Sequence, residues 1–221
     1  MDALEVFKSP FEKFRLGNKG DGGYIICDIP GEYDMLLSGG VNDDISFEEA
    51  FLDKYPGVPC LAYDGTIETF PVSRHPIQFV KKNIDQNNNL HEIVNRYSNI
   101  FVKMDIERWE YPWIYSLSHE QLARMKQIVI EFHFPDEDPY NRWSIIGKLK
   151  KTHKLVHIHG NNACDVNVRP DGTIVPHVFE CTYIRHEGDL LRNIHQFPIE
   201  LDHKNDESKP DVVLKGYPYT L

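Results

Sequence analysis

The sequence predicts a mixed α/β domain whose central sheet is mostly parallel. Short apolar runs of strand type alternate along the chain with longer stretches of helical periodicity, which is typical of β-α-β units. Two of these runs end in glycine or acidic turns, at 38–44 and 64–65, where a strand is expected to stop. The 221 residues show no internal boundary of composition, so we expect one domain spanning 1–221.

The apolar runs place the expected strands at 33–38, 60–63, 101–106, 127–134, 155–158 and 179–185. Helical periodicity and capping residues place the expected helices at 44–54, 75–85, 90–97, 112–125 and 143–151. A glycine-rich stretch at 15–24 is either a mobile loop over a ligand or a hairpin turn. The C-terminal stretch is expected to form an exposed tail that partly wraps the domain. The order of elements is that of a Rossmann-like fold with helices on both faces of the sheet.

Composition excludes several classes of partner. The net charge of -10 argues against nucleic acid, because contacts to a phosphate backbone need clustered lysine and arginine. No apolar run approaches the roughly 20 residues of a membrane span, so membrane insertion is not expected. The four cysteines form no CxxC pair, and the N-terminus lacks the apolar segment of a secretory signal. These features favour a cytoplasmic protein with reduced thiols.

Glycines follow the first strand, and an aspartate follows the second. In open α/β sheets, ligands bind at the carboxyl ends of the strands, and Gly39-Gly40-Val41 would let backbone approach such a ligand closely. Asp64, followed by Gly65, is at the spacing of a carboxylate that binds the two ribose hydroxyls of a nucleoside cofactor. A plain strand–turn–helix with a capping aspartate is the structural alternative.

The acidic residues after the glycine turn bear on the kind of cofactor. The pattern is not GxGxxG, and the carboxylates of Asp43 and Asp44 would repel a pyrophosphate. A sulfonium cofactor with an amino-acid end carries no phosphate and tolerates nearby acids. The turn therefore favours S-adenosylmethionine over a dinucleotide.

Two neighbouring strands carry polar side chains at their ends. Side chains alternate along a strand, so Asp105 should share a face with Glu107, and Glu131 with His133. Each could be an ordinary hydrogen-bonded structural group, but four at matching strand ends predict an active site. His133 or Asp105 could remove the proton of a hydroxyl group as a general base. Alternatively, a divalent cation held by Asp105, Glu131 and His133 would acidify that hydroxyl.

His157 and His159 alternate on a later strand, which Asn161 and Asn162 follow. One interpretation is a pair of edge-strand histidines followed by an Asx turn. The other is a set of side chains that bind the hydroxyl groups of a substrate.

A set of segments distributed over nearly the whole chain has a familiar order and spacing, namely 15–17, 21–24, 38–41, 44–48, 103–107 with Glu110, 159–162 and 198–202. In these segments the chain resembles the FkbM-type, S-adenosylmethionine-dependent methyltransferases. This resemblance implies a class I methyltransferase fold, with seven strands of which one is antiparallel near an edge. It implies a cofactor site made of Gly39, Gly40, Val41, Asp44, Glu48, Asp64, Gly65, Asp21 and Gly22.

The resemblance also implies the reaction and the acceptor. It places Asp105 beside the methyl-transfer site and implies O-methylation of a sugar or glycan, such as the deoxysugar rhamnose. Glycan-methylating modules of large algal viruses are one form of this group, so the chain would be a module of a larger glycan-synthesis protein. Arg108 and Trp109 depart from the family pattern, in which glycine usually follows the second acid. The residues expected to bind the acceptor are Trp109, His159 and Asn161.

Three other functions fit parts of the sequence. A metal-dependent hydrolase would use His133, His157 and His159. A nicotinamide-dependent sugar oxidoreductase would need a phosphate-tolerant glycine loop, which the sequence does not clearly contain. A glycan-binding module would keep the fold without turnover.

Overall fold

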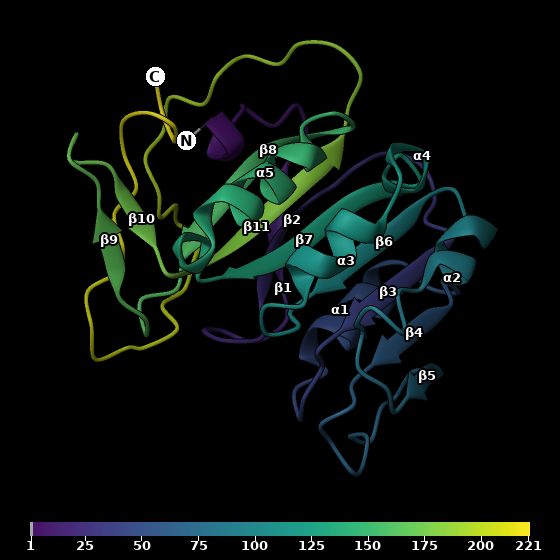
Figure 1. The fold of residues 1–221 in the computed structure, drawn as a ribbon. Coiled ribbons are helices and arrows are strands. Elements are labelled where there is room, and N and C mark those ends of the chain that lie inside the picture. The colour runs from purple at the N-terminus through teal and green to yellow at the C-terminus, as the bar shows by residue number, and fades with distance from the viewer. Residues whose placement is uncertain (1) are drawn as a thin grey trace.

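The computed structural model describes residues 2–221 and is built around a seven-stranded sheet (Figure 1). Its strands are β3 (Met35–Gly39), β4 (Cys60–Tyr63), β5 (Ile77–Val80), β6 (Ile100–Met104), β7 (Met125–His133), β8 (His153–Gly160) and β11 (Val178–Arg185). They lie in the order β5-β4-β3-β6-β7-β11-β8, and the pairs from β5 to β7 are parallel. Only β11 runs antiparallel to its neighbours, β7 and β8. The expected Rossmann-like fold class, with one antiparallel strand near an edge, is therefore confirmed.

Helices cover one face of this sheet. They are α2 (His91–Arg96), α3 (Glu110–Ser116), α4 (His119–Leu122) and α5 (Pro139–Leu149), with the 3-10 turn η1 (Asp2–Leu4) against α5. Helices α3 and α5 lie over the central strands (Figure 1), and their buried side chains belong to one apolar cluster with residues of β6, β7 and β11. This packing forms the largest apolar core of the molecule and stabilises the central strands.

A helix and a hairpin share the opposite face. Helix α1 (Ser46–Lys54) packs Phe47 and Phe51 against Phe101 of β6. Beside it lies the antiparallel hairpin of β1 (Lys13–Leu16) and β2 (Tyr24–Cys27). The side chain of Gln127 in β7 is fully buried and hydrogen-bonds both the N–H and the carbonyl of Cys27. A side chain of the central sheet therefore pairs the backbone polar groups of β2 at this residue. The stretch 15–24 is thus a hairpin turn.

The local predictions were wrong at two helices. The segment 75–85, expected to be helical, contains the edge strand β5, which pairs with β4 through Ile77 and Val80. The helix expected over 112–125 is two short helices, because Ser118 forms a capping box with Gln121 and starts α4 anew. Met125 at its expected end is the first residue of β7.

The segment after β11 forms no helix and lies against β8, where Asp202 and Asp211 contact His157 and His159. Its Phe197, Leu214 and Tyr219 side chains are buried in the main core, so this segment is partly integral to the domain rather than an exposed tail. A further hairpin, not expected from the sequence, joins β9 (Val166–Val168) to β10 (Ile174–Pro176). Among residues 2–221, no helix is long and apolar enough to cross a membrane.

Candidate active site

A cavity of about 680 Å³ opens at the carboxyl ends of β3, β4, β6 and β7. This is the edge at which ligands bind in open α/β sheets. Most of the residues predicted from the sequence line it, namely Asp21, Gly22, Gly40, Val41, Asp44, Asp64, Asp105, Glu107, Trp109, Glu131, His133 and Asn161. The predicted residues Gly39, Glu48, Gly65 and His159 do not line it.

The glycine turn after β3 brings three strands together. Gly40 has φ +72°, and its carbonyl accepts a hydrogen bond of 2.5 Å from Lys103 Nζ of β6. Its N–H donates to the Tyr63 carbonyl at the end of β4. A Cβ at Gly40 would overlap the Asp105 carbonyl oxygen, so glycine is required at this turn.

Asp64 ends β4 and organises the next turn. Its Oδ2 accepts from the Asn42 N–H (2.9 Å), and its Oδ1 accepts from the N–H (2.7 Å) and Oγ1 (2.6 Å) of Thr66. Burial raises the pKa of Asp64, but these hydrogen bonds outweigh it and hold the pKa below the ordinary value. Asp64 is therefore an ionised acceptor that joins the β3 and β4 turns, with Oδ2 facing a single protein donor among residues 2–221.

The tip of the β1–β2 hairpin reaches the same cavity. Asp44 Oδ2 accepts from the Asn18 side chain (3.0 Å), and Asp44 Oδ1 accepts from the Ser46 N–H (2.8 Å). A Cβ on Gly22 would overlap the Asp44 carboxylate. Asp44 thus holds the hairpin tip, with Asp21 and Gly22, against the mouth of the cavity.

Glu48, expected at the cofactor, lies beneath the cavity. It is fully buried and accepts a hydrogen bond from the Ser38 hydroxyl. Burial raises the pKa of Glu48, while the nearby Lys103 ammonium opposes that shift. Through this bond to Ser38, Glu48 stabilises the end of β3 just before the glycine turn.

Four carboxylates surround the His133 imidazole at the other end of the cavity. Nε2 of His133 lies 3.8 Å from Asp105 Oδ1, 3.5 Å from Glu107 Oε2 and 3.4 Å from Glu131 Oε2. Nδ1 lies 3.3 Å from Oε1 of Glu110, which also accepts the His133 backbone N–H at 2.8 Å. The structure thus brings together the four residues predicted as catalytic and adds Glu110 from α3.

The charges in this cluster are strongly coupled. Burial lowers the pKa of His133, but contacts with Glu110 and Glu131 outweigh it and raise the pKa to about 11. Burial and the charge of Glu131 raise the pKa of Asp105 to about 6. A protonated imidazole has no lone pair to accept a proton, so of the two expected bases the surroundings favour Asp105.

The turn after β6 is conformationally strained. Glu107 and Arg108 have φ values of 52° and 79°, and Phe134 after β7 has φ 49°. Such left-handed residues cost about 1–3 kcal/mol each and concentrate at functional sites. The Arg108 guanidinium lies 4.5 Å from the centroid of the Phe134 ring. Trp109 is 40% exposed and lines the cavity with Phe134, so the turn presents aromatic surface to a ligand.

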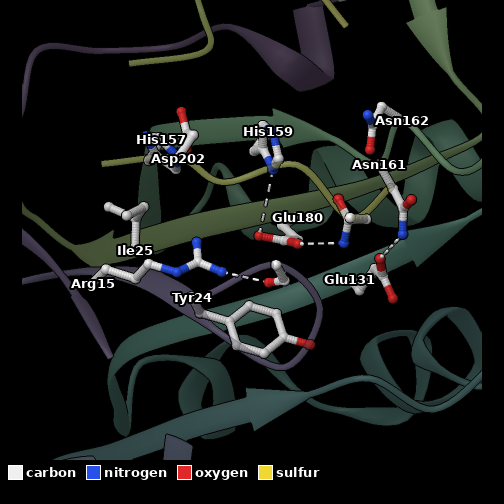
Figure 2. Close-up of polar contacts among 12 residues, drawn as sticks. Arg15, Tyr24, Ile25, Glu131, His157, His159, Asn161, Asn162, Glu180 and Asp202 are labelled. Carbon is white, nitrogen blue, oxygen red and sulfur yellow. Dashed lines mark hydrogen bonds and ion pairs between the residues drawn. The ribbon is translucent and has the colours of Figure 1, made fainter. Parts of the chain in front are cut away.

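The histidines of β8 form a separate buried cluster. His157 Nε2 lies 2.8 Å from Asp202 Oδ1, and His159 Nε2 lies 3.1 Å from Asp211 Oδ1. Figure 2 shows His159 directed at Glu180 of β11, while Asn161 reaches across to Glu131 (3.1 Å). Asn161, which the sequence predicts to bind the acceptor, therefore lines the cavity, whereas His159 is fully buried and contacts the C-terminal segment. The three histidines of the hydrolase hypothesis do not converge on one site.

Stability should depend on pH through His159. Burial lowers its pKa, but Asp211 and Glu180 outweigh burial and raise it to about 10, with Asp202 and His157 nearby. A folded pKa above the unfolded value means that the stabilisation is complete below about pH 6.5 and disappears as pH rises through 10. We expect Asp211→Asn to destabilise the protein by roughly 1.5–3 kcal/mol at pH 7 and by less at pH 10.

Urea unfolding at both pH values measures this difference. His133 titrates in the same sense in both proteins, so only the gap between wild type and Asp211→Asn reports on His159. Asp171→Asn, in the exposed turn of the β9–β10 hairpin, serves as the control. A gap that stays constant from pH 7 to 10 would contradict the assignment.

Sequence reasoning missed several residues of the site. Tyr24 donates its hydroxyl to Asp105 Oδ2 (3.1 Å), and Asn42 donates to Asp64. Lys103 is buried and directed at the glycine turn. An ionisable residue inside an apolar strand was a usable signal for Lys103, whereas the role of Tyr24 depends on hairpin docking that no local pattern reveals.

Comparisons with known proteins give similarity of structure alone. No family model and no curated protein matches the sequence. The fibrillarin/Nop5p complex contains a similar chain (TM-score 0.41, 11% identity, 69% of this chain and 73% of that one). Two methyltransferase structures are also similar. Precorrin-6y C5,15-methyltransferase from Geobacter metallireducens GS-15 has a TM-score of 0.37 and 9% identity, over 71% of this chain and 82% of that one. A SAM-dependent methyltransferase from Anabaena variabilis ATCC 29413 has a TM-score of 0.35 and 8% identity, over 69% of this chain and 77% of that one. All three TM-scores are below 0.5, so the fold is assigned from the strand order and pairing described above.

Proposed function

We propose that this protein is an S-adenosylmethionine-dependent methyltransferase that transfers a methyl group to a hydroxyl of a sugar or glycan. The observation that carries the proposal is the charge of the cavity at the glycine turn. Two lysines, Lys82 and Lys103, line it, against seven carboxylates: Asp21, Asp43, Asp44, Asp64, Asp105, Glu107 and Glu131. Such a lining suits a cofactor with sulfonium and ammonium groups and disfavours the phosphates of a dinucleotide.

The residues at the β3 and β4 ends fit this cofactor. The Gly40 turn places backbone at the cavity without a side chain in the way. Asp64 Oδ2 retains acceptor capacity for a ribose hydroxyl, because it is bonded to one donor, the Asn42 N–H, among residues 2–221. Asp44 and the hairpin tip would close over the amino-acid end. When bound, the cofactor supplies an electrophilic methyl group on positively charged sulfur.

The Asp105 cluster fits the acceptor end of the same cavity. In such a transfer the acceptor oxygen would bond to the methyl carbon as the carbon–sulfur bond breaks, and the cofactor would leave as a neutral thioether that keeps that electron pair. The hydroxyl proton passes to Asp105, whose carboxylate is 22% exposed and oriented by the Tyr24 hydroxyl. Holding oxygen and methyl at attack distance supplies most of the rate.

A sugar is the acceptor class that the lining supports. Trp109 and Phe134 offer aromatic faces against which the apolar face of a sugar ring can stack. Asn161 and the carboxylates of Glu107 and Glu131 offer hydrogen-bond partners for its hydroxyls. The resemblance to FkbM-type enzymes agrees with this choice.

Calorimetric titration with S-adenosylhomocysteine tests the cofactor. We expect one site with micromolar affinity, unchanged by a chelator, and no measurable binding of NAD or NADP. Tight dinucleotide binding without S-adenosylhomocysteine binding would contradict the methyltransferase proposal and favour a nicotinamide-dependent oxidoreductase.

Asp64→Ala should affect binding and folding together. We expect S-adenosylhomocysteine affinity to fall at least about tenfold, and the free energy of unfolding to fall by roughly 1.5–3 kcal/mol, because a charged acceptor of three hydrogen bonds is lost. Thr66→Val is the matched variant, since it removes the Thr66 hydroxyl bond and keeps the carboxylate. Its affinity should fall less than that of Asp64→Ala. Equal losses of affinity would assign Asp64 a structural role alone.

A further inference from the structure

We infer that the cluster at the ends of β6 and β7 binds one divalent cation through Asp105, Glu131 and His133. One ligand atom from each of these side chains lies within 4.8 Å of the other two. Nε2 of His133 is 3.4 Å from Glu131 Oε2 and 3.8 Å from Asp105 Oδ1. Two ligands about 2.1 Å from an octahedral ion are roughly 3 Å apart, so small inward movements of these side chains complete the site.

The atoms that face one another contact the other members of the cluster. His133 Nε2 lies 3.4 to 3.8 Å from Glu131 Oε2, Glu107 Oε2 and Asp105 Oδ1, which is the spacing of ion pairs, and the His133 side chain is 5% exposed. Among residues 2–221, none of His133 Nε2, Asp105 Oδ1 and Glu131 Oε2 has a hydrogen bond to a residue outside the cluster. The opposite atom of each side chain has a partner. The Tyr24 hydroxyl donates a hydrogen bond to Asp105 Oδ2, and the Asn161 side-chain amide donates one to Glu131 Oε1. Glu110 Oε1 is the partner of His133 Nδ1. Three side chains, each held through one atom by an outer hydrogen bond and each directing a second atom at the other two, have the arrangement of a metal site with its supporting residues.

Glu110 is the most specific of these supports. It is fully buried at the start of α3, and its Oε1 lies 3.3 Å from His133 Nδ1. A histidine that ligates a metal through one nitrogen usually donates its other N–H to a carboxylate or carbonyl. Glu110 thus directs Nε2 toward Asp105 and Glu131. Because only a neutral imidazole nitrogen ligates a metal, a bound cation would displace the Nε2 proton of His133 to solvent.

The donor set selects the class of ion. Two carboxylates and one imidazole suit an octahedral divalent cation such as Mn²⁺ or Mg²⁺ rather than a soft metal. Glu107, on the exposed turn, lies 3.5 Å from Nε2 and could approach as a fourth ligand. All four side chains line the cavity, so the remaining coordination positions face the space proposed for the acceptor. On the proposed function, the ion would bind the acceptor hydroxyl and lower the pKa of that hydroxyl, so that its proton passes to solvent water while Asp105 serves as a ligand.

Manganese binding by the chelator-stripped full chain tests the site. We expect calorimetry to give one Mn²⁺ per chain, and electron spin-echo spectroscopy to show modulation from a single imidazole nitrogen. Glu131→Gln should abolish this binding, and Glu110→Gln should weaken it about 10–100-fold. Asp43→Asn removes a carboxylate from the same cavity outside the cluster and should change Mn²⁺ affinity less than twofold.

Circular dichroism is the check that each variant folds, and the spin-echo measurement on the wild type requires no variant. An absence of imidazole modulation, or equal losses in Glu131→Gln and Asp43→Asn, would overturn the cation site. Titration with S-adenosylhomocysteine in the absence of metal is independent of it. Cofactor binding without Mn²⁺ binding would support the methyltransferase proposal and contradict the cation site. Mn²⁺ binding without cofactor binding would support the cation site and contradict the methyltransferase proposal.

Discussion

Gly40→Ala is expected to destabilise the protein by at least about 3 kcal/mol and to abolish S-adenosylhomocysteine binding. The new Cβ would overlap the carbonyl oxygen of Asp105, which belongs to the backbone and cannot rotate away. Relief requires β3 and β6 to separate at the end where Asp105 N–H donates to the Gly39 carbonyl (3.0 Å). The same movement would displace Asp105 itself from the cavity. Urea unfolding and calorimetry measure the two effects.

Gly57→Ala separates the clash from the cost of the backbone conformation. Gly57 also has positive φ (+86°), but a Cβ there meets no heavy atom within 4 Å. Its replacement should cost only the left-handed penalty of about 1–2 kcal/mol and leave cofactor affinity unchanged. If Gly40→Ala were no more destabilising than Gly57→Ala, the close contact between β3 and β6 would not be a constraint on the turn.

The fold was predictable where burial determined the pattern. The runs around Leu36, Val102 and Ile128 are buried on both faces of the sheet, so their apolar character alone identifies them as central strands. The sequence predicts a helix where the edge strand β5 lies, because this strand is partly exposed and pairs on one side only, with β4. Its strand conformation comes from that pairing, and a local sequence pattern does not report such a tertiary contact.

The site was predictable where neighbouring strands supply it. Asp105 and Glu131 follow from alternation along two parallel strands that end at the same edge of the sheet. Glu48 and His159 are residues of the same types, but each is hydrogen-bonded outside the cavity, Glu48 to Ser38 and His159 to Asp211. A polar residue in a strand therefore identifies a site only once its partners are known.

Asp105→Asn is expected to lower the rate of methyl transfer by a factor of about 10²–10⁴, the usual contribution of a positioned base. Asparagine has the same shape and can still accept the Tyr24 hydroxyl bond, so folding should be preserved. Its amide cannot take up the proton that the acceptor hydroxyl releases. Because Asp105 lies at the β6 end of the cavity, away from the Asp64 turn, S-adenosylhomocysteine affinity should change by no more than a few fold.

The role of Asp105 is decided by comparing the methyl-transfer rate of Asp105→Asn with its S-adenosylhomocysteine affinity. Asp189→Asn, at an exposed position after β11, should keep both values. A large loss of affinity with little loss of rate at saturating cofactor would place Asp105 in cofactor binding and leave the proton to another group. A loss of rate alone, accompanied by weaker Mn²⁺ binding, would join the base and the cation in one site. In that case the same carboxylate that accepts a proton in the metal-free protein positions the ion in the loaded one.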